Sequence, residues 1–355
     1  MTARLVLALT LALACAVAVP AAAHAATVAA APAADERVAE IGAFAFEHGG
    51  RLARMRVGYA TWGHLAPDRG NVVLLLPPTS GTRHSYDAWI GPGRAFDTDR
   101  FFVIAVDPIG GGRSSQPGDG LGSAFPRYTI RDMVEAQRRL LSGLGIDHLH
   151  AVAGASMGSF QAVEWGVGHP DAMDRLLLVA PAARSDAHLR SIVEGMAQTL
   201  TANPHWSDPG ARAAWSPNLR AAAAQFYPWL RSDAYLDRRG TAADLAEAQA
   251  LGDDWAVHWD PVSLLWRYRA SAGHDAGEPY AGDLHRALAR IRAKTLIVAN
   301  AQDRTVPAYL TRELAQGIAG ATTVTVPTDS GHAMIGARPG SADFDAITAA
   351  IRGFL

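Results

Sequence analysis

One five-residue stretch, Gly154-Ala155-Ser156-Met157-Gly158, constrains the fold of this chain more than any other. It follows an apolar run at residues 149–153 and precedes residues 159–169, whose composition predicts a helix. A serine flanked by glycines at a tight strand-to-helix turn adopts a strained backbone conformation, and its hydroxyl is exposed at the positive end of the helix. This context predicts that Ser156 is a nucleophile. The alternative is a glycine-rich turn that merely contains a serine.

Strand-like and helix-like segments alternate along most of the chain. Continuous apolar runs of this length are typical of strands buried on both faces of a parallel sheet. The predicted strands are residues 71–76, 101–106, 149–153, 175–180, 295–299 and 322–326. Thr129, followed by Asp132 as a capping-box partner, opens one of the predicted helices. The pattern predicts an α/β fold, with helices on both faces of a mostly parallel sheet.

Two local departures from this alternation shape the predicted architecture. Residues 44–47 and 55–59 alternate around His48-Gly49-Gly50 and predict an antiparallel hairpin, which makes the sheet mixed. Residues 184–288 are helical in pattern and rich in tryptophan, and we expect them to form an inserted cap over the active site. The predicted divisions are a signal peptide at 1–25, a flexible lead-in at 26–38, a core at 39–183 and 289–355, and the cap at 184–288.

The N-terminus has the pattern of a secretory signal peptide. Arg4 precedes an apolar run at residues 5–19, and Ala23-His24-Ala25 fits the small-x-small cleavage rule. The run is shorter than the roughly 20 residues that a membrane span requires, so we expect no stable span after cleavage. An uncleaved anchor and lipidation at Cys15 are the alternatives. The sequence therefore predicts an exported protein, periplasmic or secreted.

Composition excludes several other classes of function. The net charge of −2 provides no basic footprint for nucleic acid. Lys294 is the only lysine, which disfavours Schiff-base chemistry. Gly110-Gly111-Gly112 follows a strand but lacks the downstream acid of a dinucleotide site, and no His, Asp or Glu spacing indicates a metal site. We therefore expect no cofactor and no metal.

A serine hydroxyl needs a general base and an orienting carboxylate to act as a nucleophile. Chains with this kind of elbow place the acid and then the histidine on loops after later strands. Asp303 and His332 occupy those positions. The alternatives are that Asp303 caps a helix before Pro307, that Asp329 on the histidine's own loop is the acid, and that His332 is an ordinary surface residue.

The tetrahedral intermediate of acyl transfer requires preorganised N–H donors for its oxyanion. One predicted donor is the amide of Met157, the residue after the nucleophile. The other is expected from the loop at residues 77–81. Prolines 77 and 78 have no N–H, so Thr79 is the first possible donor there.

Several motifs together resemble the homoserine O-acetyltransferase branch of the α/β-hydrolase superfamily. They are Tyr-Ala-Thr-Trp-Gly at 59–63, Ile-Gly-Pro-Gly-Arg-Ala-Phe-Asp-Thr-Asp-Arg at 90–100, Thr-Ile-Arg-Asp-Met at 129–133 and the elbow with its helix at 156–165. The resemblance implies an α/β-hydrolase fold with an inserted helical cap. It also implies a triad of Ser156, Asp303 and His332, and a cap that could form a homodimer.

The chain also departs from that branch at its substrate site. In the homoserine enzymes an aspartate after the catalytic histidine holds the substrate ammonium, whereas Ala333 follows His332 here. A cap arginine that meets the substrate carboxylate aligns with Ala221–Ala224. An unpaired zwitterion is costly to desolvate. Acetyl-CoA, moreover, is a cytoplasmic donor that an exported enzyme would not normally meet.

These departures predict an exported serine hydrolase that acts on a small-molecule carboxylic ester. One alternative is an O-acetyltransferase that uses acetyl-CoA. The other is a non-catalytic binding protein on the same fold.

Overall fold

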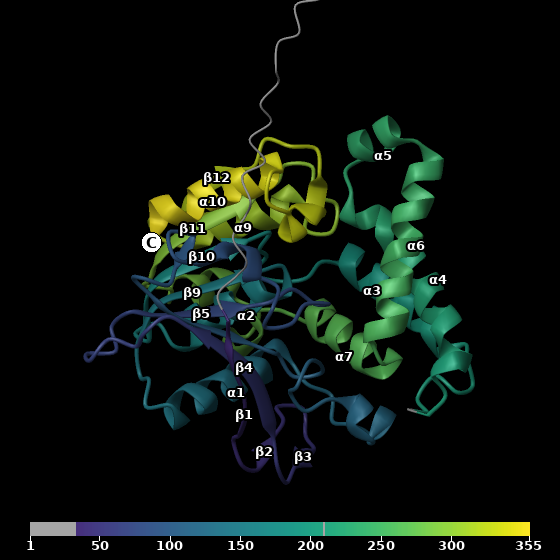
Figure 1. Ribbon diagram of the computed structural model, residues 1–355, viewed down its shortest axis with the longest axis horizontal. Coiled ribbons are helices and arrows are strands. Elements are labelled where there is room, and N and C mark those ends of the chain that lie inside the picture. The colour runs from purple at the N-terminus through teal and green to yellow at the C-terminus, as the bar shows by residue number, and fades with distance from the viewer. Residues whose placement is uncertain (1–32, 209) are drawn as a thin grey trace, which may run out of the picture. The chain divides into compact units, whose positions relative to one another are not determined.

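The computed structural model describes residues 33–208 and 210–355 and is built around an eight-stranded sheet (Figure 1). The strand order is β1-β4-β8-β5-β9-β10-β11-β12. Strand β4 pairs antiparallel with both β1 and β8, and the remaining pairings of this sheet are parallel. The bounds are β1 Asp35–Glu40, β4 Arg56–Trp62, β5 Val72–Leu76, β8 Phe102–Val106, β9 Leu149–Ala155, β10 Met173–Val179, β11 Lys294–Ala299 and β12 Thr322–Thr325. The predicted mixed, mostly parallel sheet is confirmed.

Helices cover both faces of this sheet, as the apolar strand runs predict. Along β5, Val72, Leu74 and Leu76 belong to one apolar layer, whereas Val73 and Leu75 belong to the other. The first layer contains α1 and α2, and the second contains α10. The helices are α1 Ile130–Gly143, α2 Met157–Gly168, α3 Ala187–Thr201, α4 Arg212–Leu230, α5 Asp233–Arg239, α6 Thr241–His258, α7 Pro261–Ala272, α8 Leu284–Leu288, α9 Ala308–Gly317 and α10 Ala342–Phe354.

The predicted start of α1 is confirmed in detail. Thr129 Oγ1 accepts a hydrogen bond from the Asp132 amide at 3.1 Å, and the Thr129 amide donates to Asp132 Oδ2 at 2.9 Å. This reciprocal pair satisfies two amides that the first helical turn leaves without a partner.

The lead-in prediction for residues 26–38 is wrong at its C-terminal end. Residues 35–38 lie in β1, where Val38 faces Gly58 of β4 across an antiparallel pair. This edge strand is almost entirely exposed, so it needs no apolar face and leaves no periodic signal in the sequence. The predicted signal peptide, Cys15 and residues 26–32 lie outside the described residues.

The predicted hairpin exists, but its second strand is different. β2 (Phe44–Ala45) pairs with β3 (Arg51–Leu52), and the later segment forms β4 in the main sheet. Gly49 and Gly50 have φ of +90° and +83°, a region that favours glycine. They allow a tight turn, so residues 44–45 pair with residues 51–52 directly across it. The segment at 55–59 therefore pairs in the large sheet. A second short pair joins β6 (Ile90–Gly91) to β7 (Phe96–Asp97).

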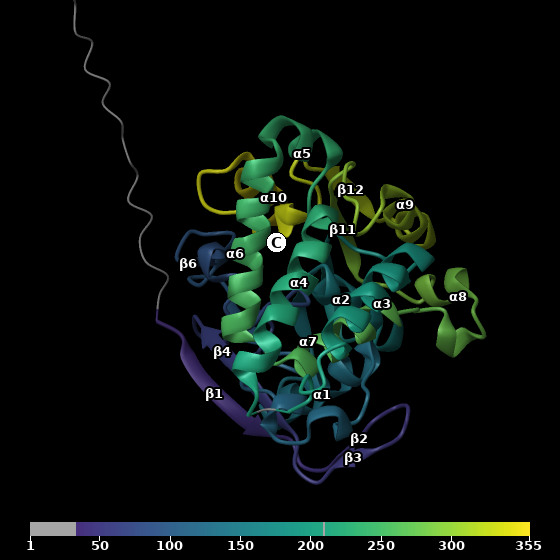
Figure 2. The ribbon, with the colours of Figure 1, turned by 90° about the vertical axis from the view of Figure 1, so that its right-hand side faces the viewer.

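A helical insertion separates β10 from β11, within the region predicted to be the cap. Helices α3, α4, α6 and α7 gather on one side of the molecule, at which Figure 2 looks directly. The two long helices α4 and α6 pack along one another, and α3 contacts α4 and α7. Trp215 and Trp255 are fully buried between these elements. None of the described helices is long and apolar enough to span a bilayer.

Candidate active site

Ser156 sits on a tight turn that requires glycine two residues before it and two residues after it. Its backbone has φ of +53° and ψ of −121°, which is rare for a residue with a side chain. A Cβ on Gly154 would lie 2.1 Å from the Gly158 carbonyl oxygen, and a Cβ on Gly158 would lie 1.8 Å from the Leu76 carbonyl oxygen. The Ser156 amide donates to the Val179 carbonyl at 2.9 Å, which holds the turn against β10. The strained elbow expected from the sequence is present.

His332 connects the serine to the acid. Ser156 Oγ lies 2.9 Å from His332 Nε2, and His332 Nδ1 lies 2.7 Å from Asp303 Oδ2. The three residues are 8%, 2% and 6% exposed, so the chain of hydrogen bonds is shielded from water. With the carboxylate accepting from Nδ1–H, Nε2 is free to accept from the serine hydroxyl. The structure thus brings together the three residues predicted from the sequence.

The Asp303 carboxylate is held in place by the backbone that follows it. Its Oδ1 accepts hydrogen bonds from the amides of Thr305 at 2.9 Å and Val306 at 2.8 Å, which leaves Oδ2 for His332. Helix α9 begins later, at Ala308, with Pro307 at its cap position. The N-cap alternative for Asp303 therefore does not describe this carboxylate.

The rival acid, Asp329, faces the cap instead of the histidine. It forms an ion pair with Arg238 of α5, with Arg238 Nη2 lying 3.2 Å from Asp329 Oδ1. The hydrogen bond from this guanidinium lowers the pKa of Asp329 below its usual value. Asp329 therefore ties the histidine loop to the cap.

The predicted oxyanion donors belong to two segments near Ser156 in the structure: Met157 follows it directly, and Thr79 lines the same cleft. Met157 is the first residue of α2, and Thr79 follows β5 in the loop that lines the same cleft. Among the described residues, neither amide donates to a backbone acceptor. An oxyanion site requires N–H groups that are free to donate, and the role of these two amides remains a prediction.

A cleft of about 960 Å³ opens over Ser156 and His332. Its walls come from both the core and the cap and are largely apolar. Among the residues that line it are Ser156, Phe160, Leu189, Phe226, Leu230, Trp255, Tyr268, Val306, His332 and Ala333. An apolar cleft with a few convergent polar groups is typical of a small-molecule site.

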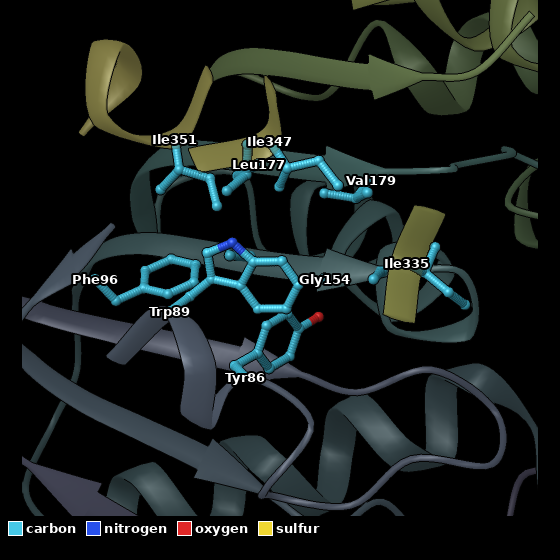
Figure 3. Close-up of a pocket in the computed structure, with 11 residues that line it drawn as sticks. Tyr86, Trp89, Phe96, Gly154, Leu177, Val179, Ile335, Ile347 and Ile351 are labelled. Atoms are coloured by element: carbon cyan, nitrogen blue, oxygen red, sulfur yellow. The ribbon is translucent and has the colours of Figure 1, made fainter. Parts of the chain in front are cut away.

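A second, much smaller hollow lies behind the elbow, on the α10 face of the sheet. In Figure 3 the indole of Trp89 lies among Tyr86, Phe96 and aliphatic side chains that include Ile351. The space amounts to about 20 Å³, room for at most one water molecule. No triad residue lines it, although Gly154 does. We regard it as a packing void beneath the turn.

The cleft contains a cap arginine, contrary to the expectation from Ala221–Ala224. None of those alanines lines the cleft, and Ala222 and Ala223 are buried inside the cap. Arg231, just after α4, does line it. Its Nη2 donates to Glu247 at 2.8 Å, and its guanidinium stacks over the Tyr235 ring at 4.4 Å. The arginine is therefore already neutralised by a carboxylate of the cap.

Arg267 of α7 is a functional candidate that no sequence motif indicated. It is fully buried, and within the described part of the chain no carboxylate pairs with it. Its Nη1 donates to the carbonyls of Thr79 at 2.9 Å and Gly81 at 2.8 Å. Its Nη2 and Nε donate to the carbonyls of Pro108 at 3.1 Å and Ile109 at 3.3 Å. Arg267 therefore fastens the predicted oxyanion loop and the neighbouring glycine-rich loop to the cap.

The sequence offered little signal for Arg267, because an arginine in an apolar cap helix has no pattern of its own. The glycine-rich loop gives a partial hint. A Cβ on Gly111 would lie 2.7 Å from Arg267 Nη2, so the glycines make room for the guanidinium. Gly110 and Gly111 thus leave room for a buried arginine, whereas Gly112 lies against the carboxylate of Asp107. In residues 33–208 and 210–355, no group of three potential metal ligands comes together.

Comparisons with known proteins agree with this geometry. Residues 71–338 match the family described as the alpha/beta hydrolase fold. The homoserine O-acetyltransferase of Clavibacter michiganensis is 33% identical over 345 residues, which cover 85% of this chain and 88% of the relative.

Two solved structures are similar in both fold and sequence. An acetylester hydrolase from Corynebacterium glutamicum aligns with a TM-score of 0.84 and 27% identity, covering 90% of this chain and 95% of that one. The acetyl esterase MekB aligns with a TM-score of 0.84 and 26% identity, covering 90% and 96%. The chain belongs to the α/β-hydrolase family, in its homoserine O-acetyltransferase-like branch, and is a serine hydrolase or acyltransferase of that fold.

Proposed function

We propose that the protein hydrolyses carboxylic esters through an acyl-enzyme on Ser156. The observation that carries this proposal is the shielded hydrogen-bond chain from Ser156 through His332 to Asp303, which opens into an apolar cleft. A non-catalytic binding protein would not need a strained serine that is hydrogen-bonded to a histidine and, through it, to a carboxylate.

The first half of the reaction acylates the serine. As Ser156 Oγ attacks the ester carbonyl carbon, His332 Nε2 takes the hydroxyl proton, and Asp303 stabilises the resulting imidazolium. The Met157 and Thr79 amides stabilise the oxyanion. The intermediate then collapses, the C–O bond to the alcohol breaks, and His332 returns the proton to the leaving alkoxide.

The second half releases the acid by the same groups in reverse. His332 takes a proton from water as the water oxygen attacks the acyl carbonyl. Collapse of the second tetrahedral intermediate breaks the bond to Ser156 Oγ, which recovers its proton from His332.

Water as the acyl acceptor is supported by three observations. Ala333 lines the cleft beside His332 and offers no charge for a substrate ammonium, and Arg231 is already paired with Glu247. Two similar structures are named as an acetylester hydrolase and an acetyl esterase. The second candidate is an O-acetyltransferase that uses acetyl-CoA, which the name of the 33% identical relative favours.

The test offers both kinds of acceptor to the same protein. Purified enzyme is incubated with short-chain nitrophenyl esters, and separately with acetyl-CoA and homoserine. We expect ester turnover that Ser156→Ala abolishes. Formation of acetylhomoserine without ester turnover would refute hydrolysis and support the transferase. Absence of both, together with no labelling by a fluorophosphonate probe, would support a binding protein.

We also propose that the protein is exported, on the strength of the N-terminal pattern. Fractionation of expressing cells and mass spectrometry of the mature N-terminus test this proposal. Recovery of the full-length chain in the cytoplasm would contradict it.

A homodimer through the cap is a further expectation. Leu245 and Val257 of α6 are each 64% exposed and offer apolar surface for it. Light scattering would detect the dimer.

A further inference from the structure

Tyr268 of α7 carries a hydroxyl without a protein partner in the active-site cleft. The side chain is 4% exposed, and it lines the same cleft as Ser156 and His332. Across residues 33–208 and 210–355 no group forms a hydrogen bond with this hydroxyl. The Tyr128 hydroxyl also lacks a partner, but it is sealed from solvent, whereas that of Tyr268 is not among the sealed atoms. The Tyr268 hydroxyl therefore opens into the cleft.

The position of Tyr268 on α7 brings it close to the predicted oxyanion loop. Ser271 lies on the same helix, three residues later, and its Oγ is 3.4 Å from Thr79 Oγ1. Residues three apart on a helix are neighbours, with Cβ atoms about 5–6 Å apart. Tyr268 is thus one helical turn from the residue that contacts the predicted oxyanion loop, and it lines the same cleft as Ser156.

Two aromatic rings fix the orientation of Tyr268. Its ring meets that of Phe226 edge-on, with centroids 5.2 Å apart, and that of Trp255 at 5.7 Å. Helices α4 and α6 supply these partners, so three cap helices hold the side chain. A rigid donor loses little freedom when it binds a ligand.

The other tyrosines near this wall are already engaged. The Tyr227 hydroxyl donates to Glu247 Oε2 at 2.7 Å, and the Tyr235 hydroxyl donates to Glu247 Oε1 at 3.0 Å. Burial raises the pKa of the Tyr268 phenol well above its ordinary value, so it stays a neutral donor. A ligand that fills the cleft removes water from this hydroxyl, and that loss costs free energy unless the ligand supplies an acceptor of its own.

We propose that the Tyr268 hydroxyl binds substrate and selects esters that carry a second oxygen, such as an ether, hydroxyl or carbonyl, a few bonds from the scissile carbonyl. This inference rests on the proposed ester hydrolysis and adds a substrate class to it. An apolar pocket discriminates weakly between chains of equal size, whereas a buried donor strongly disfavours the analogue that lacks its acceptor.

The experiment compares pairs of esters that differ only by oxygen in place of methylene. On the acyl side the pair is nitrophenyl methoxyacetate and nitrophenyl butyrate. On the alcohol side it is 2-methoxyethyl acetate and butyl acetate. The ratio of kcat/KM within each pair is measured for the wild type and Tyr268→Phe, so the intrinsic reactivity of each ester cancels between the two proteins.

We expect the oxygen-to-methylene ratio to fall about tenfold in Tyr268→Phe for one of the two pairs. That pair identifies the side of the ester that meets Tyr268. The matched control is Tyr227→Phe, a tyrosine of the same cleft whose hydroxyl is already bonded, and its ratios are expected to match the wild type. Because its hydroxyl has no protein partner, Tyr268→Phe is also expected to melt at the wild-type temperature or above.

Each other outcome overturns the inference. Ratios unchanged in Tyr268→Phe for both pairs exclude a substrate role for the hydroxyl. Equal changes in Tyr227→Phe indicate a general effect of cleft polarity, and a lower melting temperature of Tyr268→Phe reveals a protein partner. Turnover of all four esters with unchanged ratios refutes this subsite alone. A wild-type protein that hydrolyses none of them refutes the proposed function as well.

Discussion

At the scale of single residues, the site depends on which ring nitrogen of His332 carries the proton. Asp303 Oδ2 accepts from His332 Nδ1 and so selects the tautomer that leaves Nε2 free for Ser156. The backbone amides of Thr305 and Val306 keep the carboxylate oriented. The most informative substitution is therefore one that keeps the shape of the Asp303 side chain but replaces a hydrogen-bond acceptor with a donor.

Asp303→Asn is expected to lower kcat by about 10⁴-fold, because the amide favours the wrong histidine tautomer and cannot stabilise the imidazolium. Steady-state kinetics with a nitrophenyl ester provide the measurement. Asp329→Asn is the matched control, since it removes an ion pair with Arg238 at the surface and leaves the triad intact. An equal loss of kcat in both variants would show that the acid is assigned to the wrong residue.

Gly158→Ala is expected to abolish activity and to lower stability by at least about 3 kcal/mol, because the new Cβ would lie 1.8 Å from a backbone oxygen of β5. Gly168→Ala, at the other end of α2, meets no atom within 4 Å and should be neutral or slightly stabilising. Urea unfolding of both variants tests the pair. A stable and active Gly158→Ala protein would contradict the tight elbow.

At the scale of elements, α7 holds the active-site loops through a single charged side chain. Arg267 brings no carboxylate with it, and burial lowers its pKa. The carbonyl groups of two loops replace the water that would otherwise solvate the guanidinium. The cap thus contributes to the geometry of the core as well as covering it.

Arg267→Met is expected to destabilise the protein by about 3 kcal/mol or more, since it leaves several buried carbonyls without donors. The kcat should fall further than KM rises, because the loosened Thr79 amide acts in the transition state. Arg267→Lys, which retains a donor and the charge, should recover part of the stability. An unchanged kcat in a folded Arg267→Met protein would remove the loop-positioning role.

The same elements show where sequence patterns carry information and where they do not. The strands buried on both faces and the capping box of α1 were predictable, because burial and helix-end chemistry leave signals in the local sequence. Strand β1 was missed because an exposed edge strand needs no apolar residues. Arg267 and Tyr268 were missed because their roles depend on contacts across the cap, which local patterns do not record.

At the scale of the whole molecule, one carboxylate joins several parts of the cap. Glu247 of α6 accepts hydrogen bonds from Tyr227 and Tyr235, and it pairs with Arg231 and Arg239. Burial alone would raise the pKa of Glu247, but the tyrosine hydrogen bonds and Arg231 outweigh it, so the pKa is lowered.

A group whose pKa is lower in the folded state stabilises the protein above its unfolded pKa, and that contribution is lost as the pH falls through the folded value. Glu247→Gln is therefore expected to lower stability by about 1–2 kcal/mol at pH 7. The difference from the wild type should shrink below about pH 4.3, where the unfolded glutamate is protonated. Urea unfolding from pH 7 to pH 3 provides the measurement. A difference that grows in acid would have the wrong sign.

The insertion between β10 and β11 divides the reacting groups unequally along the chain. Ser156 precedes the cap, whereas Asp303 and His332 follow it. During synthesis the ribosome therefore completes the elbow long before the residues that activate it. A nascent or truncated chain that ends within the cap carries an unactivated serine. The order of translation therefore delays assembly of the triad until the last strands of the sheet have been made.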